Sequence, residues 1–268
     1  MLPAPEVLAH LVDVHCHPTD APSVTASSIE SLPCTLCAMS TRAEDQSKVA
    51  ALARAHPERI VPAFGYHPWW AHRISLDAAA GSAPDGAAHY RALFLPASAP
   101  PDAKLEAAFA RLLPHLPPPI PLADVLADVR AHLAEFPSAM LGEVGMDRVA
   151  RVPFVSPGAP NDADGGNGNG RGLSPFLTPL EHQVAVVEAQ LAIAVELRRN
   201  VSMHCVKVPA QTRALFDRMA AEHGDAWFAI SIDLHSCKIS PEAWREIGVR
   251  SHLPCVRFPS LMQGRRGG

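Results

Sequence analysis

The sequence predicts an α/β fold, a TIM-type (β/α) barrel, and three observations support that prediction. Short apolar runs alternate with longer segments of helical periodicity, which is typical of a parallel sheet whose strands are joined by helices. Seven such runs occur, and a length of 268 residues suits one barrel better than an open sheet. Hydrophobic residues make up 48% of the chain, enough for one large core. We therefore expect a single domain over residues 1–268.

The expected strands are short apolar runs bounded by polar or turn-forming residues. They cover residues 11–14, 35–40, 60–64, 139–142, 200–203, 228–232 and 254–258. The expected helices cover residues 43–55, 121–136, 179–199, 208–223 and 241–248. The third of these helices has the clearest pattern, because Val187, Leu191 and Val195 recur at helical spacing and predict one apolar face.

Two segments interrupt this alternation. Residues 75–120 contain an alanine-rich stretch and three consecutive prolines, and we expect a disordered, partly extended insertion there. Residues 153–176 are rich in Gly, Asn and Asp, so they have little apolar surface to bury and a second disordered insertion is expected. Both follow strands whose ends carry candidate site residues. They would lie over the mouth of a pocket as a lid, a partner surface or, more simply, a tolerated insertion.

Composition limits the partners and the compartment. A formal net charge of −4 argues against a broad electrostatic surface for nucleic acid, but not against a phosphate substrate held in a pocket. We find no secretory signal and no uncharged apolar run long enough to span a membrane, so a cytoplasmic or nuclear location with reduced cysteines is expected. Ordinary buried thiols are favoured for Cys34 and Cys37, because no second Cys-x-x-Cys pair completes a zinc site.

Residues that can bind a metal follow five of the expected strands. His15 and His17 lie two residues apart at the end of the first strand, so their imidazoles point in one direction. The other candidates at strand ends are His67, Glu143, His204 and His235. In a parallel barrel the active groups collect at the carboxyl ends of the strands, and imidazoles with a carboxylate suit zinc. Each histidine alone indicates only a hydrogen-bonded rim residue, whereas the set together predicts a metal site.

These segments resemble the TatD-related hydrolase family, metal-dependent nucleases and phosphoesterases within the wider amidohydrolase group. The matching segments are 13–17, 65–68, 142–147, 203–205 and 235–236. The Gly-Glu-x-Gly-Met-Asp sequence at 142–147 is the most specific of them. The long Pro-rich insertions and the sequence near Trp69 are similar to a fungal branch of the family. Some members of that branch are named for interacting with a subunit of the anaphase-promoting complex.

The resemblance implies a site with two divalent ions, which would be zinc, manganese or magnesium. His15 and His17 would bind one ion, and Glu143 would bridge to a second ion held by His204 and His235. His67 would face the substrate phosphate or orient a ligand, so Glu143 and His67 are the implied catalytic residues. Two ions about 4 Å apart activate a shared water and hold the attacked phosphate. Such a site suits hydrolysis of a nucleic acid or another phosphoester, and the many histidines favour zinc.

The C-terminal sequence departs from the family pattern. Members of the family have an eighth strand that ends in a metal-binding aspartate, and residues 256–268 contain no such motif. We therefore expect a truncated chain with seven of the eight strands, in which Asp147 and Asp233 are the nearest substitute carboxylates. The expected function is that of a TatD-type, deoxyribonuclease-like hydrolase. The alternatives are a catalytically impaired binding protein of a cell-cycle complex, docking through residues 75–120, and an inactive fragment that folds poorly.

Overall fold

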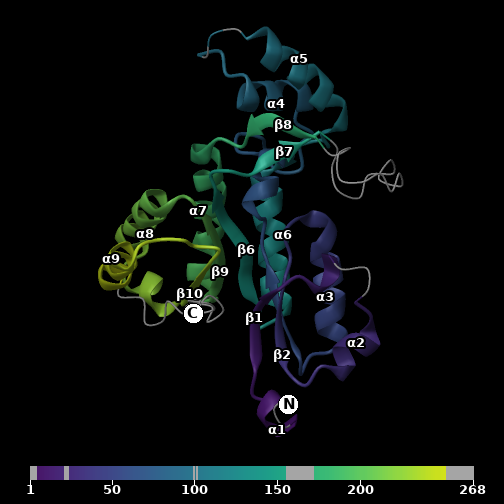
Figure 1. Cartoon of the computed structure of the whole chain (residues 1–268), viewed down its shortest axis with the longest axis vertical. Coiled ribbons are helices and arrows are strands. Elements are labelled where there is room, and N and C mark those ends of the chain that lie inside the picture. The colour runs from purple at the N-terminus through teal and green to yellow at the C-terminus, as the bar shows by residue number, and fades with distance from the viewer. Residues whose placement is uncertain (1–4, 21–23, 99, 101, 155–171, 252–268) are drawn as a thin grey trace, which may run out of the picture.

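A curled parallel sheet forms the centre of the computed structural model, which describes residues 5–20, 24–98, 100, 102–154 and 172–251. Its spatial order is β1-β2-β3-β6-β9-β10, and every neighbouring pair is parallel (Figure 1). The strands are β1 (Val12–Cys16), β2 (Thr35–Met39), β3 (Ile60–Phe64), β6 (Met140–Asp147), β9 (Val201–Val206) and β10 (Ile232–His235). This half-barrel confirms the predicted TIM-type α/β class, and it brings the carboxyl ends of all six strands to one edge.

Helices connect the strands and cover the outside of the sheet (Figure 1). They are α2 (Ala26–Ser31), α3 (Ala43–Ala55), α6 (Leu122–Glu135), α7 (Leu180–Leu197), α8 (Pro209–His223) and α9 (Pro241–Ser251), and the short α1 (Pro5–Leu8) precedes β1. The five expected helices are therefore confirmed. Val187, Leu191 and Val195 of α7 are buried in the core, as their spacing predicts. Within the described ranges, no helix has the length and apolarity of a membrane span.

One expected strand near the C-terminus has different bounds in the structure. Residues 224–229 form a 3-10 helix, η5 (Gly224–Ala229), and the strand expected at 228–232 is present as β10, which begins only at Ile232 and ends at His235. The reason is that Trp227 is fully buried against Phe216 of α8, with ring centroids 5.4 Å apart. The segment around Trp227 is apolar because it packs on helix α8, so its apolar character does not indicate a strand. The strand expected at 254–258 lies outside the described residues.

The expectation of disorder over residues 75–120 was wrong. This segment contains α4 (Gly86–Phe94) and α5 (Ala103–Leu112), flanked by the short paired strands β4 (Ile74–Ser75) and β5 (Ile120–Pro121). Asp85 caps α4 by accepting hydrogen bonds from two backbone N–H groups of its first turn, and Asp102 does the same for α5. Proline and alanine concealed two well-capped helices that carry buried aromatic residues.

The second insertion is described only at its flanks. β7 (Arg151–Pro153) and β8 (Leu173–Leu177) pair antiparallel, and residues 155–171 lie outside the described residues. α4, α5, β7 and β8 share one cluster of buried side chains, and we call these four elements the insertion unit; its buried members are Tyr90, Phe94, Phe109, Leu112, Val152 and Phe176. Figure 1 shows the insertion unit gathered beyond the end of the sheet where β6 leads into β7.

Candidate metal centre

Glu143 lies at the centre of the carboxyl edge of the sheet and is 3% exposed. The pairing of β6 with β9 shifts its register between Leu141 and Val144, which takes Glu143 out of the regular ladder. Its backbone N–H donates instead to the carbonyl oxygen of Ser40, at 2.8 Å. The local irregularity therefore directs one carboxylate into the interior of the half-barrel.

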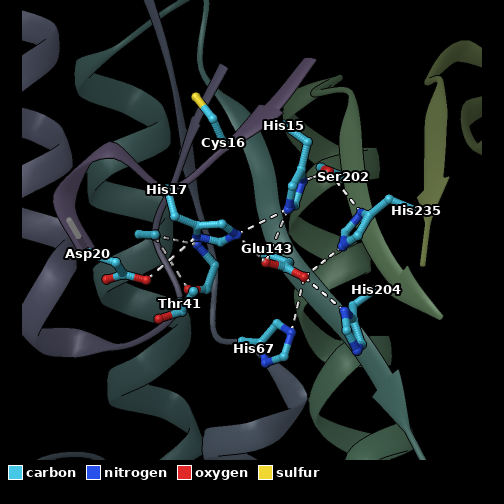
Figure 2. Close-up of polar contacts among 12 residues, drawn as sticks. His15, Cys16, His17, Asp20, Thr41, His67, Glu143, Ser202, His204 and His235 are labelled. Atoms are coloured by element: carbon cyan, nitrogen blue, oxygen red, sulfur yellow. Dashed lines mark hydrogen bonds and ion pairs between the residues drawn. The ribbon is translucent and has the colours of Figure 1, made fainter. Parts of the chain in front are cut away.

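Five imidazoles from four segments of the chain surround this carboxylate (Figure 2). Glu143 Oε2 lies 3.0 Å from His17 Nε2 and 3.4 Å from His15 Nε2. Glu143 Oε1 lies 3.0 Å from His67 Nε2, 3.0 Å from His204 Nδ1 and 2.6 Å from His235 Nε2. The structure thus brings together all six candidate residues named from the sequence.

The Ser202 hydroxyl orients two of the histidines. It lies 2.9 Å from His15 Nδ1 and 3.3 Å from His235 Nδ1 (Figure 2). A hydroxyl oxygen has two lone pairs, so it can accept a hydrogen bond from both Nδ1–H groups. With an ion bound, both rings would then present an unprotonated Nε2 to that ion, the form that binds a metal. Without an ion, Nε2 donates to Glu143 instead. The two rings also stack, with centroids 3.8 Å apart.

His67 has the opposite arrangement of its ring nitrogens. It caps η2 (Pro68–Arg73), where its Nδ1 accepts a hydrogen bond from the backbone N–H of Trp69 at 3.1 Å. In the neutral ring, Nε2 must then carry the proton and donate to Glu143. Burial lowers the pKa of His67, although its hydrogen bond to Glu143 opposes the shift. His67 is therefore arranged as a hydrogen-bond donor.

His204 lies between two carboxylates. Its Nδ1 faces Glu143, and its Nε2 lies 3.1 Å from Asp147 Oδ2. Burial alone would lower the pKa of His204, but the hydrogen bonds to Asp147 and Glu143 outweigh it and raise the pKa to about 9. For Glu143, burial alone would raise the pKa, because it disfavours the charged carboxylate. Hydrogen bonds from four histidines outweigh this effect and hold the pKa of Glu143 far below its usual range. Glu143 is therefore ionised.

The donor set fits divalent cations. Two groups of three donor atoms each lie within 4.8 Å of one another: His15, His17 and Glu143 in one, and His67, Glu143 and His204 in the other. His15 Nε2 and His17 Nε2 are only 3.1 Å apart, so two lone pairs would repel unless a proton or a cation lies between them. Nitrogen and carboxylate donors suit zinc or manganese. Glu143 belongs to both groups, so it is the residue able to bridge two ions.

Neither of the substitute carboxylates considered from the sequence joins these groups. Asp147 accepts backbone N–H groups on Oδ1, from Val149 at 2.8 Å and Ala150 at 3.0 Å. Its Oδ2 accepts from the Trp69 indole at 2.9 Å and also faces His204. Asp233 lies on β10, and its Oδ2 has no hydrogen-bond partner among the described residues. Asp147 thus supports His204, and Asp233 belongs to neither group of donors.

Gly145 allows β6 to approach β9 beside the site. Its φ is +142°, and an added Cβ would lie 2.1 Å from the carbonyl oxygen of His204. Only glycine fits both the conformation and the space. The close approach sets His204 opposite β6, within reach of both Glu143 and Asp147.

Sequence reasoning assigned no role to Ser202 or Trp69 and did not connect Asp147 to His204. Strand alternation could have indicated Ser202, because it lies two residues before His204 on β9 and faces the same side. The bond between Trp69 and Asp147 joins residues 78 positions apart, and no local pattern indicates such a contact.

Parallel strands with a cluster of imidazoles around one carboxylate at their carboxyl edge define the class of metal-dependent barrel hydrolases. The family described as TatD related DNase matches residues 12–254, so the chain belongs to this family. The resemblance expected from the segments between residues 13 and 236 is therefore confirmed. The TatD family as a whole is metal-dependent and generally hydrolytic.

Two similar proteins illustrate this membership. The Cut9-interacting protein scn1 of Schizosaccharomyces pombe is 37% identical over 218 residues, which are 80% of this chain and 59% of that protein. The crystal structure of YJJV, a TatD homologue from Escherichia coli K12, matches with a TM-score of 0.52 and 16% identity. That match covers 90% of this chain and 66% of the YJJV chain, and at this identity it shows the shared fold. The chain thus spans less than two thirds of either protein.

Proposed function

We propose that this chain is a deoxyribonuclease-like hydrolase of phosphodiester bonds that uses two divalent ions, with zinc the preferred metal. One observation carries the proposal: a single buried carboxylate, Glu143, presents each of its oxygens to a different group of imidazoles. His15 and His17 would hold the ion on the Oε2 side. His204 and His235 would hold the ion on the Oε1 side.

The chain's own residues prepare the site for a phosphodiester. Ser202 orients His15 and His235, and Asp147 holds His204. His67 has its proton on Nε2, so it is suited to donate a hydrogen bond to a phosphate oxygen. Bound divalent ions would supply a water of lowered pKa and positive charge beside the attacked phosphate. The side chain of His17 is 31% exposed while that of Glu143 is 5% exposed, so the substrate would approach past His17.

Hydrolysis of a labelled oligonucleotide tests this proposal. Metal-free protein would be restored with zinc or manganese and incubated with single-stranded DNA, in parallel with Glu143→Gln and with Glu222→Gln, an exposed glutamate on α8. We expect cleavage by the wild type and by Glu222→Gln, and a loss of about a thousandfold or more in Glu143→Gln. Equal cleavage by the wild type and Glu143→Gln would rule out the proposal.

A second candidate function is binding to a partner of the Cut9 kind, an anaphase-promoting-complex subunit. The name of the 37% identical relative favours it, as does the projection of the insertion unit from the sheet. Ala107→Arg on the exposed face of α5 should abolish capture by such a partner, whereas Ala51→Arg on the exposed face of α3 should not. Equal capture of both variants would remove α5 as the docking surface.

A further inference from the structure

Two neighbouring tryptophans of η2 have opposite environments. Trp70 is buried, and the guanidinium groups of Arg42 and Arg73 lie over its ring, 4.7 and 4.3 Å from the centroid. Trp69 is 53% exposed, and among the described residues it is the one aromatic side chain in the set of large exposed apolar side chains. Trp70 therefore stabilises the fold, whereas the exposed surface of Trp69 needs another explanation.

Trp69 is fixed in position although it is exposed. Its indole N–H donates to Oδ2 of the buried Asp147 at 2.9 Å. Its ring centroid lies 5.0 Å from that of His67, with the planes at 88°, and 6.2 Å from that of His204. A rigid, half-exposed aromatic ring thus stands at the rim of the metal centre and contacts two of its histidines.

Two cations follow the neighbouring strands at the same edge. Arg148 comes directly after β6 and Lys207 directly after β9, and the Arg148 backbone N–H donates to the carbonyl of Val206 at 3.1 Å. Both residues are exposed, and neither forms an ion pair with another residue in the part of the chain that the structure describes. In a chain with net charge −4, these cations lie beside a site that suits a phosphate.

We infer that Trp69 stacks on an unpaired base of a single-stranded nucleic-acid substrate, while Arg148 and Lys207 bind the phosphates next to the reacting one. This inference rests on the proposed phosphodiester hydrolysis and adds the residues that hold the substrate beside the reacting phosphate. Aromatic side chains stack on bases of any sequence, but a base inside a duplex has both faces covered by its neighbours. The exposed face of Trp69 is therefore available to an unpaired base beside the metal centre.

Binding and kinetics together test the role of Trp69. Single-stranded oligothymidylate should quench part of the tryptophan fluorescence of the wild type, and Trp69→Ala should lose that quenching. Trp69→Ala should raise the KM for the oligonucleotide about ten- to a hundredfold with a smaller change in kcat, and Trp69→Phe should restore most of the loss. An oligonucleotide of the same length without bases should show no such difference between the wild type and Trp69→Ala.

The salt dependence of binding tests the two cations. Each of Arg148→Gln and Lys207→Gln should reduce the slope of log K against log salt concentration by about 0.7. Lys48→Gln, an exposed residue of α3, should leave the slope unchanged. Unchanged slopes in the first two variants would overturn their assignment as phosphate contacts.

The outcomes separate this inference from the proposed function. If the wild type cleaves the oligonucleotide and Trp69→Ala does so with the same KM and the same quenching, the stacking role is overturned and hydrolysis stands. If the oligonucleotide quenches Trp69 but no phosphodiester is cleaved with zinc or manganese, hydrolysis is overturned and the stacking role is supported. Thermal unfolding of each variant, expected to match that of the wild type, shows that the fold is intact.

Discussion

The carboxyl edge of the sheet and the insertion unit both bury side chains completely, but with opposite chemistry. At the edge, Glu143, His67 and His204 are each less than a tenth exposed, and both imidazoles lie 3.0 Å from a carboxylate oxygen of Glu143. In the insertion unit the buried cluster is apolar and mainly aromatic. The ring of Phe176 lies 5.1 Å from that of Phe94 and 6.2 Å from that of Phe109.

This difference indicates what each region contributes. Burial of aromatic surface stabilises a fold by about 25 cal/mol per Å², whereas a buried carboxylate costs free energy unless charged partners and hydrogen bonds compensate it. The insertion unit therefore adds stability. The carboxyl edge keeps a costly cluster of charged and polar groups, which is expected where the cluster serves binding or catalysis.

The largest predicted effect is on stability, and it follows from removing an aromatic ring of the insertion unit without touching the carboxyl edge. Phe176→Ala should lower the free energy of unfolding of the insertion unit by about 3–5 kcal/mol, because it leaves a cavity between Phe94 and Phe109. Urea unfolding and hydrogen exchange of α4 and α5 would measure this loss. Zinc affinity, measured by competition with a chelator, should stay within about twofold of wild type. A parallel loss of zinc affinity would mean that the regions are not independent.

The second prediction compares the loss of one buried serine hydroxyl at the carboxyl edge with the loss of another in the insertion unit. Ser202→Ala removes the hydroxyl that orients His15 and His235, so zinc affinity should fall about 10- to 100-fold. Ser174→Ala also removes a fully buried hydroxyl, but this one accepts a hydrogen bond from the backbone of Phe176 in the insertion unit. It should lower thermal stability and leave zinc affinity unchanged. Equal zinc affinity in both variants would contradict the orienting role of Ser202.

The third prediction concerns pH, at the junction of η2 with the insertion unit. Burial lowers the pKa of His72 to about 3, and the charges of Arg73, His182 and His89 act in the same direction. Between pH 3 and the ordinary histidine value near 6.5, the unfolded chain therefore binds one proton more at this position than the folded chain. Stability should fall as the pH falls through this window, by up to about 1.4 kcal/mol per pH unit.

His72→Gln cannot take up that proton. Its unfolding free energy, measured on metal-free protein from pH 7 to pH 5, should fall less steeply than that of the wild type, by the equivalent of about one proton. Identical slopes for the two proteins would show that His72 is protonated in the folded state.

Local patterns predicted much of the fold. Helix α7 could be predicted because its apolar residues recur at helical spacing over 18 residues. The candidate site could be predicted because histidines and one glutamate interrupt the sequence at the ends of apolar strands. α4 and α5 were missed because the proline and alanine content of the segment concealed Asp85 and Asp102 at their N-termini.

Long-range contacts could not be predicted in this way. The Ser202 hydroxyl meets His15 across 187 positions of sequence, and the Trp69 indole meets Asp147 across 78. These pairings depend on the curl of the sheet and on the register shift in β6, which no local periodicity records. The same curvature brings His235 against His15, although β10 and β1 are the two end strands of the sheet.

The number of metal ions bound per chain tests most directly whether one carboxylate serves two groups of imidazoles. Metal-free wild type and Glu143→Gln would be saturated with zinc, freed of excess metal and analysed by mass spectrometry for zinc per chain. We predict two zinc ions per wild-type chain and at most one per Glu143→Gln chain. Equal zinc content in the two proteins, or none in the wild type, would contradict the account.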